Sequence, residues 1–224
     1  MNVSEEKELA REGTANRRVV RETYDRIAPH FAKTRPEPWS EVATFLEGRE
    51  GQEGLDVGVG NGRHAELLAR HCARVLALDL SRAALDEASR RSQEKRFTID
   101  IVAGDASALP VRGGSVDLAV YVATLHHLAP RSGRVASLNE LARVLRPGGR
   151  GIVSAWCVTH DRFDADVGFD TTVAWTLPDG TVVDRYYHIY DQAEFEADLE
   201  ASKLDPRSTF ESRGNCYAIV GPAR

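Results

Sequence analysis

A glycine-rich segment near the end of the first quarter of the chain has residue types and spacing that could hold a nucleoside. Residues 55–62 read Leu-Asp-Val-Gly-Val-Gly-Asn-Gly, and Asp79 closes the next apolar run, residues 75–78. An apolar strand that turns through glycines into a helix lets backbone N–H groups approach a ligand. A carboxylate at the end of the second strand can accept hydrogen bonds from a ribose diol. The pattern therefore indicates a site for a nucleoside-containing cofactor.

The spacing of the glycines separates two cofactor classes. Gly58, Gly60 and Gly62 alternate and Asp56 stands two residues before the first of them, whereas the dinucleotide motif reads G-x-G-x-x-G. A pyrophosphate needs a helix N-terminus left free for two phosphates. A sulfonium cofactor brings a positive centre and an amino-acid tail, which a carboxylate at the turn suits better. The segment favours S-adenosylmethionine over NAD, and the alternative interpretation is a tight turn that binds nothing.

Further residues with possible chemistry follow the third and fourth apolar runs. Asp105 ends the run at residues 102–106 and is positioned to accept the adenine amino group, unless it is only a turn residue. His126 and His127 come after the run at residues 115–121, so two imidazoles either line the site or pack behind it. Asp117 alone favours a structural role. A metal site lacks a third ligand at workable spacing.

Composition limits the class of protein. The chain has 224 residues, 42% hydrophobic and 28% charged, which suits one sizeable α/β domain better than two. The net charge of −5 argues against broad electrostatic adhesion to nucleic acid, although a local basic face would survive such averaging. Overall charge therefore leaves an RNA substrate open.

The cysteines and the apolar runs suggest where the protein works. Cys72, Cys157 and Cys216 are scattered without a C-x-x-C pair, so we interpret them as buried small residues. The start of the chain lacks a secretory pattern and no apolar stretch reaches membrane-spanning length. The sequence predicts a soluble, cytoplasmic protein that does not use a membrane.

Alternating apolar patterns predict the elements that must position these residues. Asn16 can cap a first helix that Pro29 ends or kinks, and a second short helix follows Pro38. The alternation then predicts strands near 54–58, 74–79, 97–102, 116–122 and 150–156, with helices near 62–71, 82–92 and 132–145. This order predicts a doubly wound, mostly parallel seven-stranded Rossmann-like sheet with helices on both faces.

The last third of the chain changes character. Segments 172–175 and 181–183 flank a Pro-Asp-Gly turn and predict a hairpin. Asp191 can cap a following helix, and segments 208–211 and 217–220 predict antiparallel edge strands. We expect one domain over 1–224, with a helical cap at 1–50, a cofactor-binding core at 51–156 and a substrate side at 157–224.

Taken together, residues 50–156 resemble the class I S-adenosylmethionine-dependent methyltransferases in the order and separation of these segments. The resemblance implies that Asp56, Gly58, Gly60 and Gly62 hold the methionine end of the cofactor. It implies ribose binding by Asp79 and adenine contacts from Asp105 and Ala106. The expected cofactor set is completed by Tyr24, Leu80 and Val122.

The flanks resemble a narrower group, the tRNA wobble-uridine methyltransferases that esterify a 5-carboxymethyl group. The matching positions are residues 24–31, Thr34-Arg35, Pro38-Trp39, His126-His127, Arg134, Trp156 and residues 185–188. Residues 214–217 depart from that group, which often has Asn-Trp-Tyr there, and the loop 157–170 is acidic. The resemblance implies tRNA as substrate and a small zinc-binding activator protein that shields an apolar sheet edge.

This interpretation assigns roles to the substrate side. An acetate-type carboxylate is ionised at neutral pH, so methyl transfer to it needs alignment more than a strong base. Arginines could orient the carboxylate or nearby phosphates, aromatic rings could stack on the base, and a histidine could shape the methyl-transfer funnel. The candidates are Arg35, Arg134 and Arg185 for orientation, Trp156, Tyr186 and His188 for stacking, and His126 or His127 for the funnel.

Two other functions remain open from the sequence. A methyltransferase for a small molecule, such as a quinone precursor or a carboxylic acid, would have an enclosed apolar pocket and arginines that point to solvent. A non-catalytic cofactor-binding subunit is the third possibility. The intact glycine turn and the ribose acid argue against that third function, and each single arginine could also be an ordinary surface charge.

Overall fold

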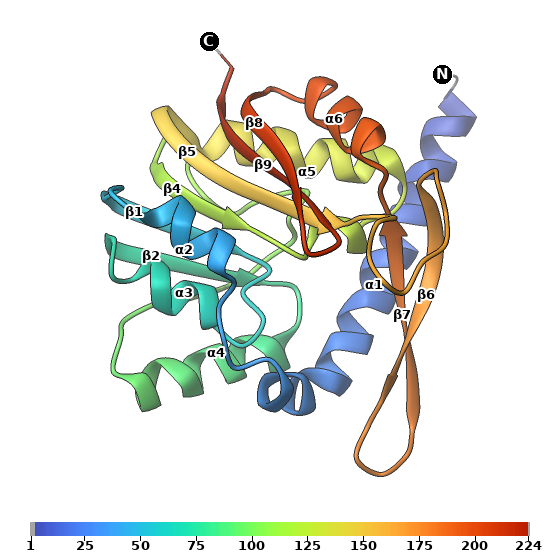
Figure 1. The fold of residues 1–224 in the computed structure, drawn as a ribbon, viewed down its shortest axis with the longest axis horizontal. Helices are drawn as coiled ribbons and strands as arrows, with labels where there is room; N and C mark the ends of the chain where they lie inside the picture. The colour runs from blue at the N-terminus through green and yellow to red at the C-terminus, as the bar shows by residue number, and fades with distance from the viewer. Residues whose placement is uncertain (1–2, 224) are drawn as a thin grey trace.

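The centre of the structure is a seven-stranded sheet in the order β3-β2-β1-β4-β5-β9-β8 (Figure 1). The computed structural model describes residues 3–223, with side chains for residue 8 and for residues 11–223. The strands are β1 (Gly51–Val57), β2 (Cys72–Asp79), β3 (Asp100–Ala103), β4 (Val116–Tyr121), β5 (Leu145–Trp156), β8 (Leu204–Ser212) and β9 (Asn215–Pro222). Strands β1 to β5 are parallel, and β9 runs antiparallel to both β5 and β8.

Helices cover both faces of this sheet and bury two separate apolar clusters. One cluster joins the sheet to α2 (Ser40–Leu46), α3 (Arg63–Leu68) and α4 (Arg82–Lys95). The other joins it to α5 (Arg131–Val144) and α6 (Gln192–Glu200). The doubly wound, mostly parallel architecture predicted from the sequence is confirmed, and the carboxyl ends of β1, β2 and β4 meet at one edge, where such folds bind ligands.

The first helix is longer than the sequence pattern predicts. Helix α1 (Val3–Thr34) begins well before Asn16, so the prediction that Asn16 caps it is wrong. It also runs through Pro29, so of the two effects predicted for this proline, an end of the helix is wrong. A proline in a helix interior removes one backbone hydrogen bond. The helix continues because its apolar face stays buried on both sides of the proline, with Ile27, Ala28 and Ala32 all nearly inaccessible to solvent.

Strand β5 also begins earlier than predicted. We expected a strand near 150–156 after a glycine-containing break, but β5 starts at Leu145, which pairs with Val116 of β4. The register between the two strands shifts between Val116 and Leu118, so the Pro-Gly-Gly segment is absorbed as an irregularity within the strand.

A two-stranded hairpin stands apart from the main sheet. Strands β6 (Phe169–Thr176) and β7 (Val182–Ile189) pair only with each other among the described strands and lie beside α1 (Figure 1). Gly180, with φ of 84°, makes the turn that the Pro-Asp-Gly segment predicts. Asp191 caps α6 as predicted, because its Oδ1 accepts a hydrogen bond from the Glu194 N–H over 2.8 Å.

Candidate active site

A cavity of about 890 Å³, including the space at its mouth, lies beyond the carboxyl ends of the parallel strands. Its floor is formed by the glycine turn after β1 and by residues that follow β2, β3 and β4. Helix α1 roofs it. The roofing side chains are Asn16, Arg17, Val20, Tyr24 and Phe31. Every residue that lines the cavity lies between Asn16 and Leu128, so the C-terminal part of the chain takes no part in the lining.

Two of the three alternating glycines shape the cavity. Gly58 and Gly60 line it with φ of 74° and 54°, a left-handed conformation that side chains disfavour. A Cβ atom on Gly58 would collide with the Thr124 side chain. Gly62 has a different role, because it precedes α3 and a Cβ there would come within 3.2 Å of the Ala88 Cα atom in α4. The third glycine therefore permits close packing of helices and does not line the cavity.

Asp79 holds the glycine turn in place from the end of β2. Its Oδ2 accepts a hydrogen bond from Gly60 N over 3.0 Å, and its Oδ1 accepts one from Ser81 N over 2.9 Å. Burial raises the pKa of this carboxyl group. Both Asp79 and the following Leu80 line the cavity, where the carboxylate oxygens have lone pairs left for a ligand.

Asp56 lies beneath the turn instead of in the cavity wall. Only 2% of it is exposed, and its Oδ2 has no hydrogen-bond partner in the part of the chain that the structure describes. Burial, followed by the nearby charge of Asp79, raises the pKa of Asp56 to about 7, although Arg63 opposes this. A buried carboxylate oxygen without a donor is unusual and leaves this position able to accept a hydrogen bond or to face a positive charge.

Arg63, which the sequence analysis did not select, lines the cavity directly after the turn. It is 7% exposed, and its guanidinium lies 6.0 Å from the Phe31 ring centroid and 5.5 Å from that of Trp39. Burial lowers its pKa to about 10. Among the described residues no carboxylate forms an ion pair with it. The signal was present in the sequence, since a cation at the first position of a helix opposes the helix dipole.

The far end of the cavity contains the segment after β3. Asp105 and Ala106 both line it, as does Val122 after β4. The Asp105 Oδ1 accepts hydrogen bonds from the backbone N–H and the hydroxyl of Ser107, each over 2.8 Å. The Asp105 Oδ2 forms an ion pair of 3.0 Å with Arg17 Nε, which brings a helix α1 cation to this end of the cavity.

The two adjacent histidines face different surroundings. Both belong to η1 (Leu125–His127), a single 3-10 turn. His127 lines the cavity, and its Nε2 lies 2.7 Å from the Tyr24 hydroxyl. His126 is 1% exposed and accepts a hydrogen bond at Nδ1 from the Trp156 N–H over 2.9 Å. Burial holds the pKa of His126 well below its ordinary value, so it is a neutral packing group and does not shape the cavity.

Arg185 lies behind Tyr24, next to the cavity but outside its lining. It is 5% exposed, and it donates to the Tyr187 hydroxyl over 2.8 Å and to the Val173 carbonyl over 3.4 Å. Its guanidinium is 4.8 Å from the Trp175 ring centroid, and its positive charge acts on the Tyr24 hydroxyl. In the described part of the chain no carboxylate pairs with it. With these neutral partners, some of the five N–H donors of the guanidinium remain available to a ligand.

Arg134 and His188, expected to face the substrate, are instead bound to carboxylates away from the cavity. Arg134 is 3% exposed and pairs with Asp198 and Glu194, each over 3.3 Å. The two ring nitrogens of His188 lie 2.7 Å from Asp170 and 2.8 Å from Glu194. These contacts fasten the base of the hairpin to α5 and α6, which is a structural task.

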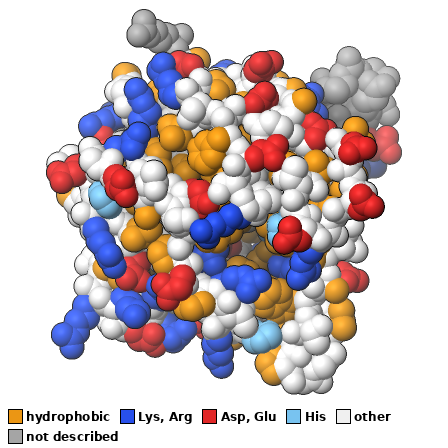
Figure 2. Space-filling model, in the orientation of Figure 1, with side chains coloured by type: hydrophobic (Ala, Val, Ile, Leu, Met, Phe, Trp, Pro, Cys, Tyr) orange, Lys and Arg blue, Asp and Glu red, His pale blue; other side chains and the backbone are white. Residues whose placement is uncertain are grey.

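The aromatic residues expected to stack on a base are also engaged. Trp156 has two stacked neighbours, His160 and Tyr187, each with its ring centroid 4.6 Å away. The Tyr186 hydroxyl donates to Asp170 over 2.8 Å. Neither side chain reaches the cavity. Arg35, by contrast, is exposed and does not line the cavity. Figure 2 shows Lys and Arg side chains around a hollow near the centre of this face.

The comparisons with known proteins agree with this geometry. Residues 55–153 match the family model described as a methyltransferase domain. A putative methyltransferase of Encephalitozoon cuniculi is 30% identical over 181 residues, which cover 77% of this chain and 80% of that protein. The chain belongs to the S-adenosylmethionine-dependent methyltransferases, which makes it an enzyme that uses S-adenosylmethionine as cofactor.

Other relatives are more specific in name but much longer. The Xenopus tropicalis protein named tRNA (carboxymethyluridine(34)-5-O)-methyltransferase alkbh8 is 33% identical over 149 residues, or 66% of this chain. That match covers only 22% of the relative, so the chain spans about a fifth of the length of the first curated relatives it matches.

Two solved structures show the same fold at low sequence identity. Burkholderia thailandensis 1,6-didemethyltoxoflavin-N1-methyltransferase, solved with S-adenosylhomocysteine, has a TM-score of 0.73 at 19% identity and covers 95% of this chain and 91% of its own. The Haloferax volcanii Trm112 methyltransferase activator in complex with a putative methyltransferase gives a TM-score of 0.67 at 17% identity, covering 92% and 98%.

Proposed function

We propose that this methyltransferase esterifies a carboxylate, the carboxymethyl group of a tRNA wobble uridine. The observation that carries this proposal is the buried guanidinium of Arg185, which has no carboxylate partner among the described residues and lies beside Tyr24 at the cavity wall. An unpaired buried cation costs several kcal/mol. An anionic acceptor group would offset that cost at the place where the methyl group is delivered.

The cavity lining supports a proposed arrangement of the cofactor. Asp79 can accept hydrogen bonds from the ribose, and Asp105 with Ala106 can contact the adenine. The unpartnered Asp56 oxygen and the Arg63 guanidinium offer complementary charges for a zwitterionic amino-acid end. Tyr24 and Val122 line the space between these ends, so the residues present fit a nucleoside with an amino-acid tail.

The chemistry agrees with the neutral surroundings of the acceptor position. Bound S-adenosylmethionine supplies a methyl group on a positively charged sulfur. A carboxylate oxygen would bond to this methyl group while S-adenosylhomocysteine leaves with the electrons of the broken C–S bond, and since the carboxylate has no proton to lose, no strong general base is required. His127 is buried, Tyr24 is half-buried and both are neutral, and they can align and enclose the acceptor while they keep water out.

The tRNA acceptor is supported by the relatives. Curated proteins at 31–35% identity from vertebrates, a plant and a yeast carry the name tRNA carboxymethyluridine methyltransferase. The match to the yeast protein covers 71% of this chain and 57% of that protein. We place the proposed reaction in the cytoplasm, as expected from the sequence. None of the described helices combines the length and the apolar character needed to span a membrane.

We also propose a small activator protein as partner. Strand β3 forms one edge of the seven-stranded sheet, it is only four residues long, and its Ile101 is 41% exposed. An exposed sheet edge with an apolar side chain is a place where another chain can bind. The structural neighbour from Haloferax volcanii was solved with such an activator, which supports this proposal.

A small-molecule acceptor is the alternative. It predicts arginines that point to solvent around an enclosed apolar pocket. The roof formed by α1 does enclose the cavity, but Arg185 is buried beside it, and this favours an anionic acceptor.

The experiment that tests the proposal is single-turnover methylation of carboxymethyl-bearing tRNA. Arg185→Ala should slow methyl transfer by at least roughly 30-fold, because truncating one partner of a buried charge pair costs about 2–5 kcal/mol. Arg185→Lys should recover little, since a point charge cannot replace a planar fork. Arg26→Ala, on the exposed side of α1, is the control. Wild-type rates in Arg185→Ala would refute the assigned acceptor site, and unchanged tRNA nucleosides in a deletion strain would refute the substrate.

A further inference from the structure

Two guanidinium groups share one tryptophan ring beside the acceptor position. Arg185 lies 4.8 Å and Arg35 lies 5.8 Å from the ring centroid of Trp175 in β6. The indole is held from α1, because its Nε1 donates to His30 Nδ1 over 3.1 Å and its ring contacts Phe31. A fixed aromatic ring with two cations positions both charges relative to each other.

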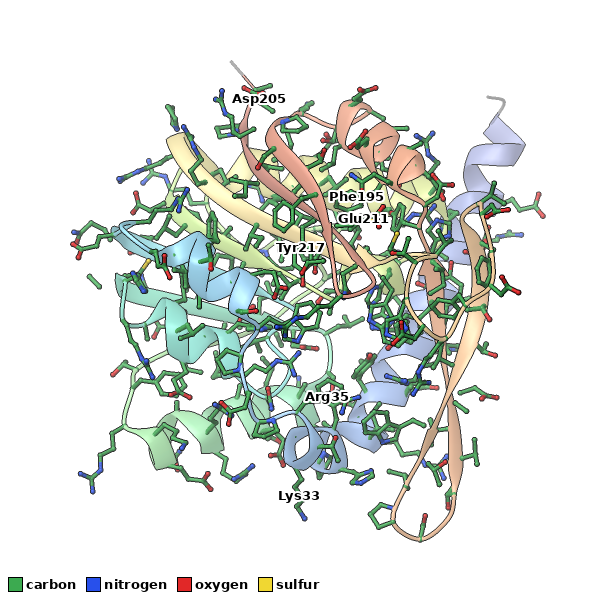
Figure 3. All side chains as sticks on the ribbon, in the orientation of Figure 1. Lys33, Arg35, Phe195, Asp205, Glu211 and Tyr217 are labelled. Carbon is green, nitrogen blue, oxygen red and sulfur yellow. The ribbon has the colours of Figure 1, made fainter. Side chains whose placement is uncertain are left out.

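The backbone of Arg35 is fastened to the glycine turn. Its carbonyl accepts hydrogen bonds from Asn61 Nδ2 over 2.8 Å and from Arg63 Nη1 over 3.3 Å. The connection between α1 and α2 is therefore held against the cofactor side of the cavity. In Figure 3 Arg35 lies toward the centre of this face, whereas Lys33 extends away from the molecule.

The Arg35 side chain has donors to spare. It donates to the Thr34 carbonyl over 3.1 Å, and within the described part of the chain no carboxylate pairs with it. Arg35 shares the Trp175 ring with Arg185, and its carbonyl accepts from Arg63, so three guanidinium groups that form no ion pair with any described carboxylate lie in one region. After burial, the charge of Arg35 is the next cause that lowers the pKa of Arg63. Such a cluster of like charges is favourable only if anions bind to it.

The three cations face different parts of the site. Arg63 lines the cofactor cavity beside the glycine turn, and Arg185 lies behind Tyr24 at the proposed acceptor carboxylate. Arg35 is exposed and does not line the cavity. A small monocarboxylic acid has no second anion to offer Arg35. A nucleotide within RNA has one, the phosphodiester next to the modified base.

We infer that Arg35 binds a backbone phosphate adjacent to the methylated nucleotide, so the site recognises two anions of one acceptor, the phosphate at Arg35 and the carboxylate at Arg185. This inference rests on the proposed function and adds the division of work between the two arginines. The planar fork of arginine suits phosphate oxygens. An exposed phosphate contact contributes to binding and depends on salt concentration, whereas a buried carboxylate contact contributes to alignment for the reaction.

The test uses a short anticodon-loop oligonucleotide that carries the carboxymethyl uridine. One version has natural phosphodiesters, and the other has uncharged methylphosphonates on both sides of the modified nucleotide. For the wild type, the neutral version should raise KM roughly five- to tenfold with little change in kcat, the size expected for one solvent-exposed hydrogen bond. Arg35→Ala should show the same raised KM on both versions. For Arg35→Ala, the slope of the logarithm of the binding constant against the logarithm of the salt concentration should also be smaller in magnitude than that of the wild type by about 1.

Lys33→Ala is the matched control, because Lys33 is an exposed cation two residues away that extends from the molecule. It should keep the wild-type preference for the charged oligonucleotide. The inference would be overturned if the neutral oligonucleotide raised the KM of Arg35→Ala as much as that of the wild type. It would also be overturned if the wild type had the same KM for both versions. A wild-type enzyme that methylates neither version but binds the cofactor would overturn the proposed function itself, a result that is separate from the other two.

Discussion

The hydroxyl group of Tyr24 donates a hydrogen bond to Nε2 of His127 over 2.7 Å, and the opposite side of the imidazole sets the direction of this bond. His127 Nδ1 lies 2.9 Å from the Tyr186 carbonyl, which can only accept. The proton therefore resides on Nδ1, and Nε2 is free to accept from tyrosine. Burial, helped by the charge of Arg185, lowers the pKa of His127 to about 3, so this ring is neutral at any physiological pH.

The neutral Tyr24–His127 pair leads to a prediction about pH. Burial also raises the pKa of Tyr24 well above its ordinary value, so neither group changes protonation in the working range. With a carboxylate acceptor, single-turnover methyl transfer at saturating cofactor should be nearly constant between about pH 6 and pH 9. The measurement is quenched-flow transfer of a labelled methyl group. A rate that rises tenfold per pH unit would point to an acceptor that must lose a proton and would contradict the carboxylate.

A second prediction concerns Arg17, which brings α1 to the adenine end of the cavity. Arg17 pairs with Asp105 over 3.0 Å, and both side chains line the cavity wall. Without Arg17 the Asp105 carboxylate loses a partner that orients it. Arg17→Ala should therefore weaken S-adenosylhomocysteine binding by roughly five- to 20-fold in isothermal titration, which corresponds to about 1–2 kcal/mol, the contribution of one hydrogen bond.

Two companions sharpen the Arg17 experiment. Arg18→Ala removes the next residue, which is exposed and does not line the cavity, and should bind like the wild type. S-inosylhomocysteine, in which a carbonyl oxygen replaces the adenine amino group, should lose less affinity than S-adenosylhomocysteine when Arg17 is removed. Equal losses for the two ligands would mean that Arg17 supports the helix alone and does not orient Asp105.

A third prediction follows from the carboxyl group of Asp56. Its pKa is raised to about 7 in the folded protein, so the folded state holds a proton that the unfolded chain releases near pH 4. The folded protein thus loses stability as pH rises through this interval, and the loss is complete above the folded-state pKa. Asp56→Asn cannot ionise and should lose less stability than the wild type between about pH 5 and pH 8.

Urea unfolding of the wild type and of Asp56→Asn, at the two ends of this pH range, measures how much stability each protein loses. The comparison uses the change in unfolding free energy with pH, because an asparagine amide also alters packing at both values. Asp86→Asn, a change at an exposed position of α4, should reproduce the wild-type pH dependence. If Asp56→Asn and the wild type lose the same stability, Asp56 is already ionised at the lower pH.

The fold could be predicted because its signals are local. Alternating apolar runs fix strands and helices, and the glycine turn with Asp79 marks where the strands end. Local signals could not predict which arginines pair with a carboxylate in the folded protein. Arg134 pairs with Asp198, which is 64 residues away, whereas among the described residues Arg185 hydrogen-bonds to the Tyr187 hydroxyl and the Val173 carbonyl and to no carboxylate. Nothing in the neighbouring sequence distinguishes a cation that will be paired from one that will not.

The paired histidines illustrate the same limit on a smaller scale. His126 and His127 are adjacent, yet a single 3-10 turn directs one toward the Trp156 backbone and the other toward Tyr24. Their roles depend on residues from α1, β5 and β7, which only the folded chain brings together. Arg63 could have been selected from its position at the helix start, because that position disfavours a cation.

The β6–β7 hairpin has a consequence for how acceptor specificity can change over evolutionary time. Among the described strands it pairs with none of the seven in the main sheet, and it contributes no residue to the lining of the cofactor cavity. It nevertheless carries Trp175, Arg185 and Tyr187. Its hydrogen bond with His127 comes from the Tyr186 backbone carbonyl, which survives any substitution at that position, and its ring contact with His127 comes from Tyr187. Substitutions confined to this hairpin could therefore change which acceptor the enzyme methylates, while the binding site for the methyl donor stays the same.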